Sequence, residues 1–320
     1  MNDIQTYLHY FSKLRRDSKN GGAPHKPILL LAVSRLVEKG FIDSRFIDIT
    51  PELVIEFKDL WSKLVVTDHN PNFSLPFFHM RSEPFWKLVS KAGTDFPLTS
   101  SHSIKSLNGL KDALLYAEID EQLFRLFMDP ISNAVLQEVL LEKYFPETKK
   151  DYHTNGADLF SELETQILHE DQVVYRQRID ELKNNLSKEA FEEELFVRGG
   201  VFKREIPKIY NYQCAISGMR VESTSNAQMV DACHIVPFAF SKDDTITNGI
   251  SLSPNFHRAF DRGLITISSD FKVKISSTVR EIDSPYSLGQ FNGMKVRLPE
   301  NMQFHPSVAN LQWHEERIFR

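Results

Sequence analysis

The chain has 320 residues, of which 41% are hydrophobic and 25% charged, and its formal net charge is -5 at pH 7. This length is enough for two globular domains with separate cores. No apolar run is long enough for a membrane span and no signal peptide is recognisable at the start, so we expect a cytoplasmic protein without membrane contacts. The acidic balance does not exclude a nucleic-acid partner, because a local basic face is sufficient for one.

The first half of the sequence predicts a mostly helical domain. We expect helices over residues 2–17, over the apolar run from Ile28 to the Gly40 stop, over 51–66, and twice between 113 and 144 with a break near Asp129-Pro130. The aromatic run 73–80 is predicted to be a short strand.

A polar, turn-rich stretch, PETKKDYHTNG over residues 146–156, is the best candidate for a domain boundary. A long charged helix is expected after it, over residues 157–195, serving as a connector or a dimerisation arm. Gly199-Gly200 then opens a compact segment. The expected fold class is α+β, with a helical domain over 1–150, a helical linker over 151–195 and a second domain over 196–320.

The residues with the clearest chemistry lie between positions 230 and 263. Residues 230–236 alternate as a strand does, which places Asp231 and Cys233 on one face and His234 on the other. A polar loop leads to Asn248 and a short second strand. Ser253-Pro254 is a typical helix start, and His257 and Asp261, four residues apart, share a face of that helix and can hold one ion together.

This order of strand, loop with Asn248, strand and helix resembles the HNH (ββα-metal) nucleases, in the branch of modification-dependent, McrA-type restriction enzymes. The motifs that carry the resemblance are D-x-C-H-I-x-P, N-G-I-S-L-S and H-R-x-F-D-R-G. It implies an α+β nuclease domain that cuts double-stranded DNA in phage defence, as a homodimer if both strands are cut. It also implies His234 as general base, Asn248 as the residue that braces the loop and orients His234, and His257 with Asp261 as ligands of Mg²⁺, Mn²⁺ or another divalent ion.

A third metal ligand is left open by the sequence. Many HNH enzymes have a ligand directly before the general base, but Cys233 occupies that position and a soft thiol suits Mg²⁺ poorly. Asp231 is the nearest carboxylate, and it is either a ligand or a supporting residue. A structural zinc is not expected, because Cys214 is followed by Ser217 where a second cysteine would stand.

The N-terminal half resembles the sulfur-binding domain of restriction enzymes that recognise phosphorothioate DNA. The resemblance rests on APHKPILLL from Ala23, LPFFHMR from Leu75 and PFWKL from Pro84. It implies that Pro76 contacts the sulfur, and that the flanking DNA is held by four further residues: His25, Lys26, His79 and Arg81. Sulfur is larger and more weakly hydrated than oxygen, so an apolar cavity can prefer it.

Two other functions remain open at this level. The first is an HNH nuclease that reads another modification, such as a methylated or hydroxymethylated base. The second is a DNA-binding regulator with an inactive HNH module. Structural roles also compete for single residues, since a lone strand histidine such as His234 is more often a core residue and Phe77 and Phe78 are more often buried than in contact with a ligand.

Overall fold

The structure is a computed structural model that describes residues 3–18, 21–93, 104–153, 159–221, 223 and 228–320. The chain divides into two compact units, the first containing residues 1–162 and 185–197 and the second residues 163–184 and 198–320. Both units combine helices with small antiparallel sheets, which confirms the α+β class. The residues expected to form a linker, 151–195, are shared between the two units. Among the described residues, no helix is long and apolar enough to cross a membrane.

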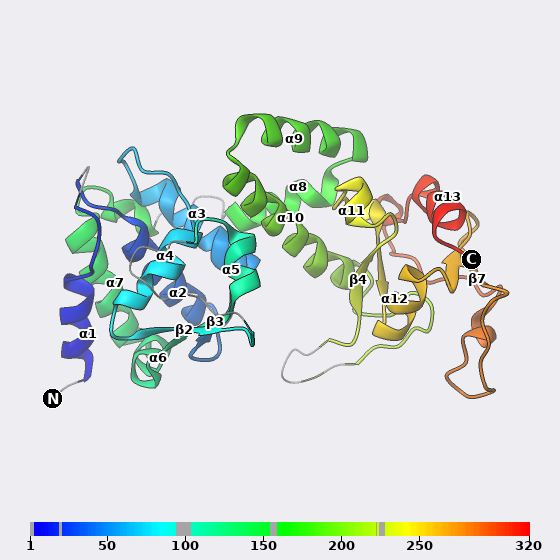
Figure 1. Ribbon diagram of the computed structural model, residues 1–320, viewed down its shortest axis with the longest axis horizontal. Helices are drawn as coiled ribbons and strands as arrows, with labels where there is room; N and C mark the ends of the chain where they lie inside the picture. The colour runs from blue at the N-terminus through cyan, green and yellow to red at the C-terminus, as the bar shows by residue number, and fades with distance from the viewer. Residues whose placement is uncertain (1–2, 19–20, 94–103, 154–158, 222, 224–227) are drawn as a thin grey trace. The chain divides into compact units, whose positions relative to one another are not determined.

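The first unit contains a three-stranded sheet with helices packed around it (Figure 1). The strands are β1 (Phe46–Ile47), β2 (Trp86–Ser90) and β3 (Leu114–Ile119), paired antiparallel in the order β1-β3-β2. The helices are α1 (Asp3–Ser12), α2 (His25–Glu38), α3 (Pro51–Leu64), α4 (Ser74–His79), α5 (Leu107–Ala113), α6 (Glu121–Met128) and α7 (Pro130–Tyr144), with short 3-10 turns η2 (Met80–Ser82) and η3 (Lys149–His153).

Helix α2 forms the centre of this unit's core. Every residue from Ile28 to Val33 is fully buried, and the helix packs against α3 and α7. A helix that is apolar on all sides is stable only when other elements cover it all round. The apolar run that predicted the helix therefore also explains its central position.

The aromatic segment 73–80 is helical, so the predicted strand is wrong. The side-chain oxygen of Asn72 accepts a hydrogen bond from the Leu75 backbone N–H at 3.0 Å, and α4 begins there. The rings of Phe73 and Phe77, four residues apart, pack with their centroids 5.6 Å apart. Side chains at this spacing meet on one face of a helix, whereas a strand would separate them.

The break at Asp129-Pro130 is confirmed. Helix α7 begins at Pro130, and the Asp129 carboxylate accepts a hydrogen bond from the Ser132 backbone N–H at 2.9 Å. The residues before α6 differ from the prediction, since Leu114–Ile119 form the central strand β3 instead of a helix.

The second unit contains two hairpins and several helices. Its strands are β4 (Asp231–His234) paired with β5 (Gly249–Leu252), and β6 (Ile265–Ile267) paired with β7 (Val273–Ile275). Its helical elements are α11 (Phe238–Ser241), η4 (Ile246–Asn248), α12 (Pro254–Asp261), η5 (Leu288–Phe291), η6 (Met302–Phe304) and α13 (Val308–Arg317), with parts of α8 (Leu159–His169), α9 (Gln172–Asn185) and α10 (Lys188–Ile209).

The long helix predicted over residues 157–195 is three helices, α8, α9 and α10. Asp171 accepts hydrogen bonds from the Val173 and Val174 backbone N–H groups, and Ser187 accepts one from Ala190. Capping side chains of this kind begin new helices. Gly199-Gly200 does not break the helix, because α10 continues through both glycines to Ile209, although the second unit resumes close by, at Arg198.

Candidate functional site

The β4–β5 hairpin and helix α12 form the ββα unit that the sequence predicted (Figure 1). Ser253 is the N-cap residue of α12 and Pro254 is its first helical residue. Gly263 follows the helix with φ of +68°, and a Cβ there would lie 2.0 Å from the Ile318 carbonyl oxygen. The turn after α12 therefore requires glycine, both for its backbone conformation and for its space.

One face of β4 meets helix α12 and forms a cluster of metal-binding groups. Ligand atoms of Cys233, His257 and Asp261 all lie within 4.8 Å of one another. The two helix residues approach through His257 Nε2 and Asp261 Oδ2, 3.5 Å apart. A nitrogen, a carboxylate oxygen and a sulfur are together a donor set that fits a divalent cation.

Asp231 supports this cluster from the other side of the imidazole. Its Oδ2 lies 3.2 Å from His257 Nδ1, and it is not among the three clustered ligand residues. A carboxylate on the second nitrogen of a ligand histidine fixes the tautomer and the direction of the ring. The structure thus places Asp231 where it positions His257, and places Cys233 beside the ligand atoms.

Cys233 is completely buried. Burial, with Asp261 and Asp231 close by, raises the pKa of its thiol well above the ordinary value. Its Sγ lies 3.9 Å from Asp261 Oδ1. The other cysteine, Cys214, is also buried and free, and its sulfur accepts a hydrogen bond from the Ser253 hydroxyl at 3.6 Å.

His234 contacts a different set of groups from Cys233. Its Nε2 lies 2.8 Å from Oδ1 of Asp244, a carboxylate with almost no exposed surface. Its ring stacks on Phe202 of α10, with centroids 4.1 Å apart and an interplanar angle of 9°. The Tyr175 hydroxyl donates to Asp244 Oδ2 at 3.4 Å, and burial followed by the charge of Asp244 raises the pKa of Tyr175. The result is a hydrogen-bonded chain from tyrosine to carboxylate to imidazole.

Asn248 is buried and braces the loop after β4. Its amide donates to the Val236 and Asp243 carbonyl oxygens at 3.0 and 2.9 Å, and its Oδ1 accepts from the Val236 N–H at 2.9 Å. Asn310 donates to the same oxygen at 3.1 Å. The sequence suggested that this amide also orients His234, but the imidazole bonds to Asp244. Sequence reasoning missed Asp244; the paired aspartates at 243 and 244, just before Asn248, were the available signal.

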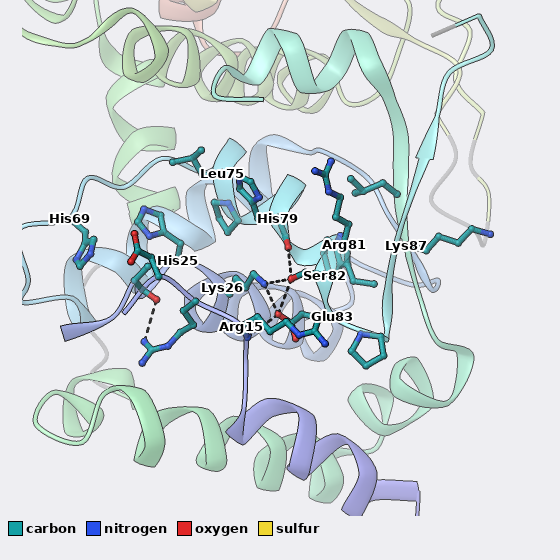
Figure 2. A pocket seen from close by; sticks show the side chains of 17 residues that line it. Arg15, His25, Lys26, His69, Leu75, His79, Arg81, Ser82, Glu83 and Lys87 are labelled. Atoms are coloured by element: carbon teal, nitrogen blue, oxygen red, sulfur yellow. Dashed lines mark hydrogen bonds and ion pairs between the residues drawn. The ribbon is translucent and has the colours of Figure 1, made fainter. Parts of the chain in front are cut away.

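The first unit contains a cavity of about 1260 Å³ that includes every residue predicted to contact DNA. The cavity is lined by charged side chains, histidines and apolar side chains, which include Arg15, Arg16, His25, Lys26, His69, Leu75, Pro76, His79, Arg81, Glu83, Trp86 and Lys87. Figure 2 shows Lys26, Ser82 and Glu83 joined by hydrogen bonds, with His25 and His69 to one side and Arg81 and Lys87 to the other. Segments far apart in the sequence thus converge on one concave surface.

Lys26 is an ion-paired residue of this cavity. Its Nζ lies 2.5 Å from Glu83 Oε1 and 2.7 Å from Ser82 Oγ, and the Lys26 and Glu83 side chains are 8% and 4% exposed. Burial lowers the pKa of Lys26, while the bond to Glu83 opposes that change. The lysine charge is therefore already balanced inside the protein.

Two of the three histidines that line the cavity, His25 and His79, favour their neutral forms. Burial lowers the pKa of His25, whose Nε2 lies 2.9 Å from the Asn70 carbonyl oxygen. Burial also lowers the pKa of His79, and the charges of Arg81 and Lys26 act in the same direction. The Arg81 guanidinium lies over the Phe78 ring, 3.8 Å from its centroid, as in a cation–π contact.

Comparisons with known proteins match the two regions of the chain that contain these groups. The HNH endonuclease family matches residues 214–268, and the ScoMcrA-like DNA sulfur-binding domain family matches residues 4–153. No curated protein matches the chain. The chain therefore contains a domain that matches the HNH endonuclease family. More particularly, it joins this domain to a second one that matches the ScoMcrA-like DNA sulfur-binding domain family.

Two solved structures are similar to parts of the chain. One is described as the modification dependent TagI restriction endonuclease, with 18% identity and a TM-score of 0.30, and the likeness spans 37% of each chain. The other is described as the type IV phosphorothioation-dependent restriction endonuclease ScoMcrA, with 12% identity and a TM-score of 0.35 over 79% of this chain and 93% of that one. The chain thus spans well under half the length of the first of these relatives.

Proposed function

We propose that this protein recognises phosphorothioate-modified double-stranded DNA through the cavity of its first unit and hydrolyses phosphodiester bonds at its HNH site. The observation that supports recognition is the convergence of His25, Lys26, Pro76, His79 and Arg81 on one cavity. These residues come from separate segments of the sequence, and a purely structural role for each would not require them to share a concave surface.

The chemistry of the cavity suits a sulfur atom flanked by phosphates. Pro76 is buried at its wall, and an apolar ring there disfavours a well-hydrated phosphate oxygen more than a sulfur. The neutral histidines add hydrogen-bonding groups without a fixed charge. Arg15, Arg81 and Lys87 supply the positive charge for the neighbouring phosphates, because Lys26 is already paired with Glu83.

For cleavage, we assign His234 to accept the proton of the attacking water. Donation of its Nε2–H to Asp244 would leave Nδ1 as the basic nitrogen, and the carboxylate would stabilise the imidazolium after proton transfer. Asn248 would keep the loop that carries Asp244 in place. The stack on Phe202 fixes the plane of the ring.

His257 and Asp261 would hold a divalent cation, with Asp231 fixing the His257 ring. Such an ion, Mg²⁺ or Mn²⁺ in the usual case, supplies positive charge next to the scissile phosphate and the leaving 3′ oxygen when it is bound. One site cuts one strand, so we further propose that the protein acts in the cytoplasm as a homodimer when it cuts both strands.

Cleavage of matched plasmids tests the proposal. We expect plasmid carrying phosphorothioates to be cut in the presence of Mg²⁺, Mn²⁺ or another divalent ion, unmodified plasmid to be cut much more slowly, and EDTA to stop both reactions. Preferential cutting of a methylated or hydroxymethylated plasmid would replace phosphorothioate as the modification. Failure to cut any plasmid with any divalent ion would instead favour a DNA-binding regulator with an inactive nuclease module.

A further inference from the structure

Cys233 lies in the metal cluster although cysteine is an unexpected residue for a magnesium nuclease. It is the third residue of β4, its thiol is fully buried, and its Sγ is within 4.8 Å of the ligand atoms of both His257 and Asp261. Strand β4 and helix α12 thus bring a sulfur, a nitrogen and a carboxylate oxygen together where the two elements meet.

The carboxylate that competes for the same role is already engaged elsewhere. Asp231 contacts His257 Nδ1, and this contact directs His257 Nε2 toward Asp261. The side chains of Asp231 and Asp261 are similarly exposed, at 50% and 54%. It is Asp261 that lies beside the buried Cys233 sulfur. The sulfur of Cys233 is therefore grouped with the His257 and Asp261 ligand atoms, whereas the Asp231 carboxylate contacts the imidazole.

We propose that Cys233 is a metal ligand together with His257 and Asp261, and that the site consequently selects a thiophilic divalent ion such as Zn²⁺ or Co²⁺ over Mg²⁺. Thiolate is a soft ligand that binds zinc and cobalt well and magnesium poorly. On binding, the Sγ–H bond breaks, the proton goes to solvent and the sulfur lone pair forms the bond to the ion, so no oxidant or reductant is required. This inference rests on the proposed position of the metal site, but its test does not depend on DNA cleavage.

Cobalt provides the readout, because a thiolate bound to Co²⁺ gives a charge-transfer band in the near ultraviolet, separate from the visible bands that report the ion's coordination. We expect the metal-free full-length protein to develop this band when titrated with Co²⁺. Cys233→Ser should lose the band and bind Co²⁺ at least about tenfold more weakly. A loss of about tenfold in metal affinity is the lower end of what is seen even for residues that only hydrogen-bond a metal ligand. The matched control is Cys214→Ser, which removes a buried thiol outside the cluster and should keep the band.

Competition gives the second measurement. Equimolar Zn²⁺ should displace Co²⁺ and abolish the band, while a large excess of Mg²⁺ should not. A wild-type protein that binds Co²⁺ without the band, or that loses Co²⁺ to Mg²⁺ as readily as to Zn²⁺, would overturn the inference. Circular dichroism shows whether Cys233→Ser folds, and Cys233→Ala offers a second variant if it does not.

The result also separates this inference from the proposed function. Rapid DNA cleavage with Mg²⁺ and no charge-transfer band would leave the nuclease proposal intact and remove the thiolate ligand. A charge-transfer band that depends on Cys233, in a protein that cuts no DNA, would support the thiolate ligand and remove the nuclease proposal.

Discussion

His234 is held on two sides by groups that the second unit buries around it, the Phe202 ring and the Asp244 carboxylate. The carboxylate holds the imidazole through Nε2 and can stabilise the charge that the ring gains in proton transfer. Asp244→Asn keeps the size and an acceptor oxygen but removes the charge. We expect it to lower the cleavage rate about tenfold, part of the roughly 10²–10⁴-fold that a general base contributes.

The measurement is the single-turnover cleavage rate, with His234→Ala as the reference for complete loss of the base. DNA affinity should stay unchanged in both variants, since neither group lines the cavity of the first unit. A wild-type cleavage rate in Asp244→Asn would mean that the aspartate is only structural.

Lys26 was predicted to contact DNA, but in the fold it forms a buried ion pair with Glu83. Removal of one partner from a buried ion pair leaves an uncompensated charge and costs about 3–5 kcal/mol. We therefore expect Lys26→Ala to lower the free energy of unfolding by about 3 kcal/mol, because the Glu83 carboxylate is then buried without its countercharge. Lys87→Ala, at an exposed position of the same cavity, is the control and should cost little stability.

Urea denaturation of the two lysine variants provides the comparison. The double variant Lys26→Met with Glu83→Gln should recover much of the lost stability, because it removes both charges together. If Lys26→Ala were as stable as the wild type but bound DNA more weakly, the lysine would be a phosphate contact after all.

Sequence reasoning found residues by type and local spacing, and it failed where partners are distant along the chain. The pairing of His257 with Asp261 follows from helical periodicity alone. By contrast, the contacts between Lys26 and Glu83 and between His234 and Phe202 join residues far apart in sequence. No local pattern specifies such contacts, so their effects on charge and orientation became visible only in the fold.

Among the elements, helix α10 contributes a buried carboxylate to the first unit. Glu193 accepts a hydrogen bond from the Phe73 backbone N–H at 3.1 Å, at the start of α4, and lies 3.8 Å from Lys58 Nζ. Burial raises the pKa of Glu193 from 4.5 to about 7. The folded protein therefore binds this proton more tightly than the unfolded chain, and the stabilisation is complete below pH 4.5 and is lost as the pH rises to about 7.

Glu193→Gln should remove this pH dependence, because the amide oxygen still accepts from Phe73 and has no proton to lose. We expect the thermal midpoint of the variant to change less than that of the wild type between pH 5 and pH 8, and to be higher at pH 8, by about 2–4 °C for each kcal/mol relieved. Glu194→Gln, at the neighbouring carboxylate that pairs with Lys58, should not have this effect. An unchanged slope in Glu193→Gln would assign the proton uptake to another group.

The boundaries of elements were predictable where capping residues and apolar periodicity agreed. The apolar run of α2, the Asp129-Pro130 break and the Ser253-Pro254 start were all found from sequence. The strand predicted over 73–80 failed because aromatic content was given more weight than the Asn72 cap. The single helix predicted over 157–195 failed because the capping side chains of Asp171 and Ser187 lie within an otherwise helical composition.

At the scale of the whole molecule, the first unit would bind the modified DNA and the second unit would hydrolyse the phosphodiester bond. The cavity lies entirely within residues 15–88, and the HNH groups within residues 231–261. Variants of the two regions should therefore have separable effects, which a single combined site would not allow.

Binding of short duplexes to the full-length protein tests that separation. Pro76→Ala should bring the affinities for phosphorothioate and unmodified duplexes close together, because it opens the apolar wall while it leaves the cations in place. Arg81→Ala should weaken both duplexes alike and reduce the slope of log affinity against log salt by about 1, as expected for one lost phosphate contact. His234→Ala should bind both duplexes like the wild type and cut neither. Pro71→Ala, at an exposed proline outside the cavity, should behave as the wild type throughout. The contrary outcome is that Pro76→Ala retains the full preference for sulfur while Arg81→Ala removes it. The modification would then be read through charge and not through an apolar wall, and Arg81 would be the residue that distinguishes sulfur from oxygen.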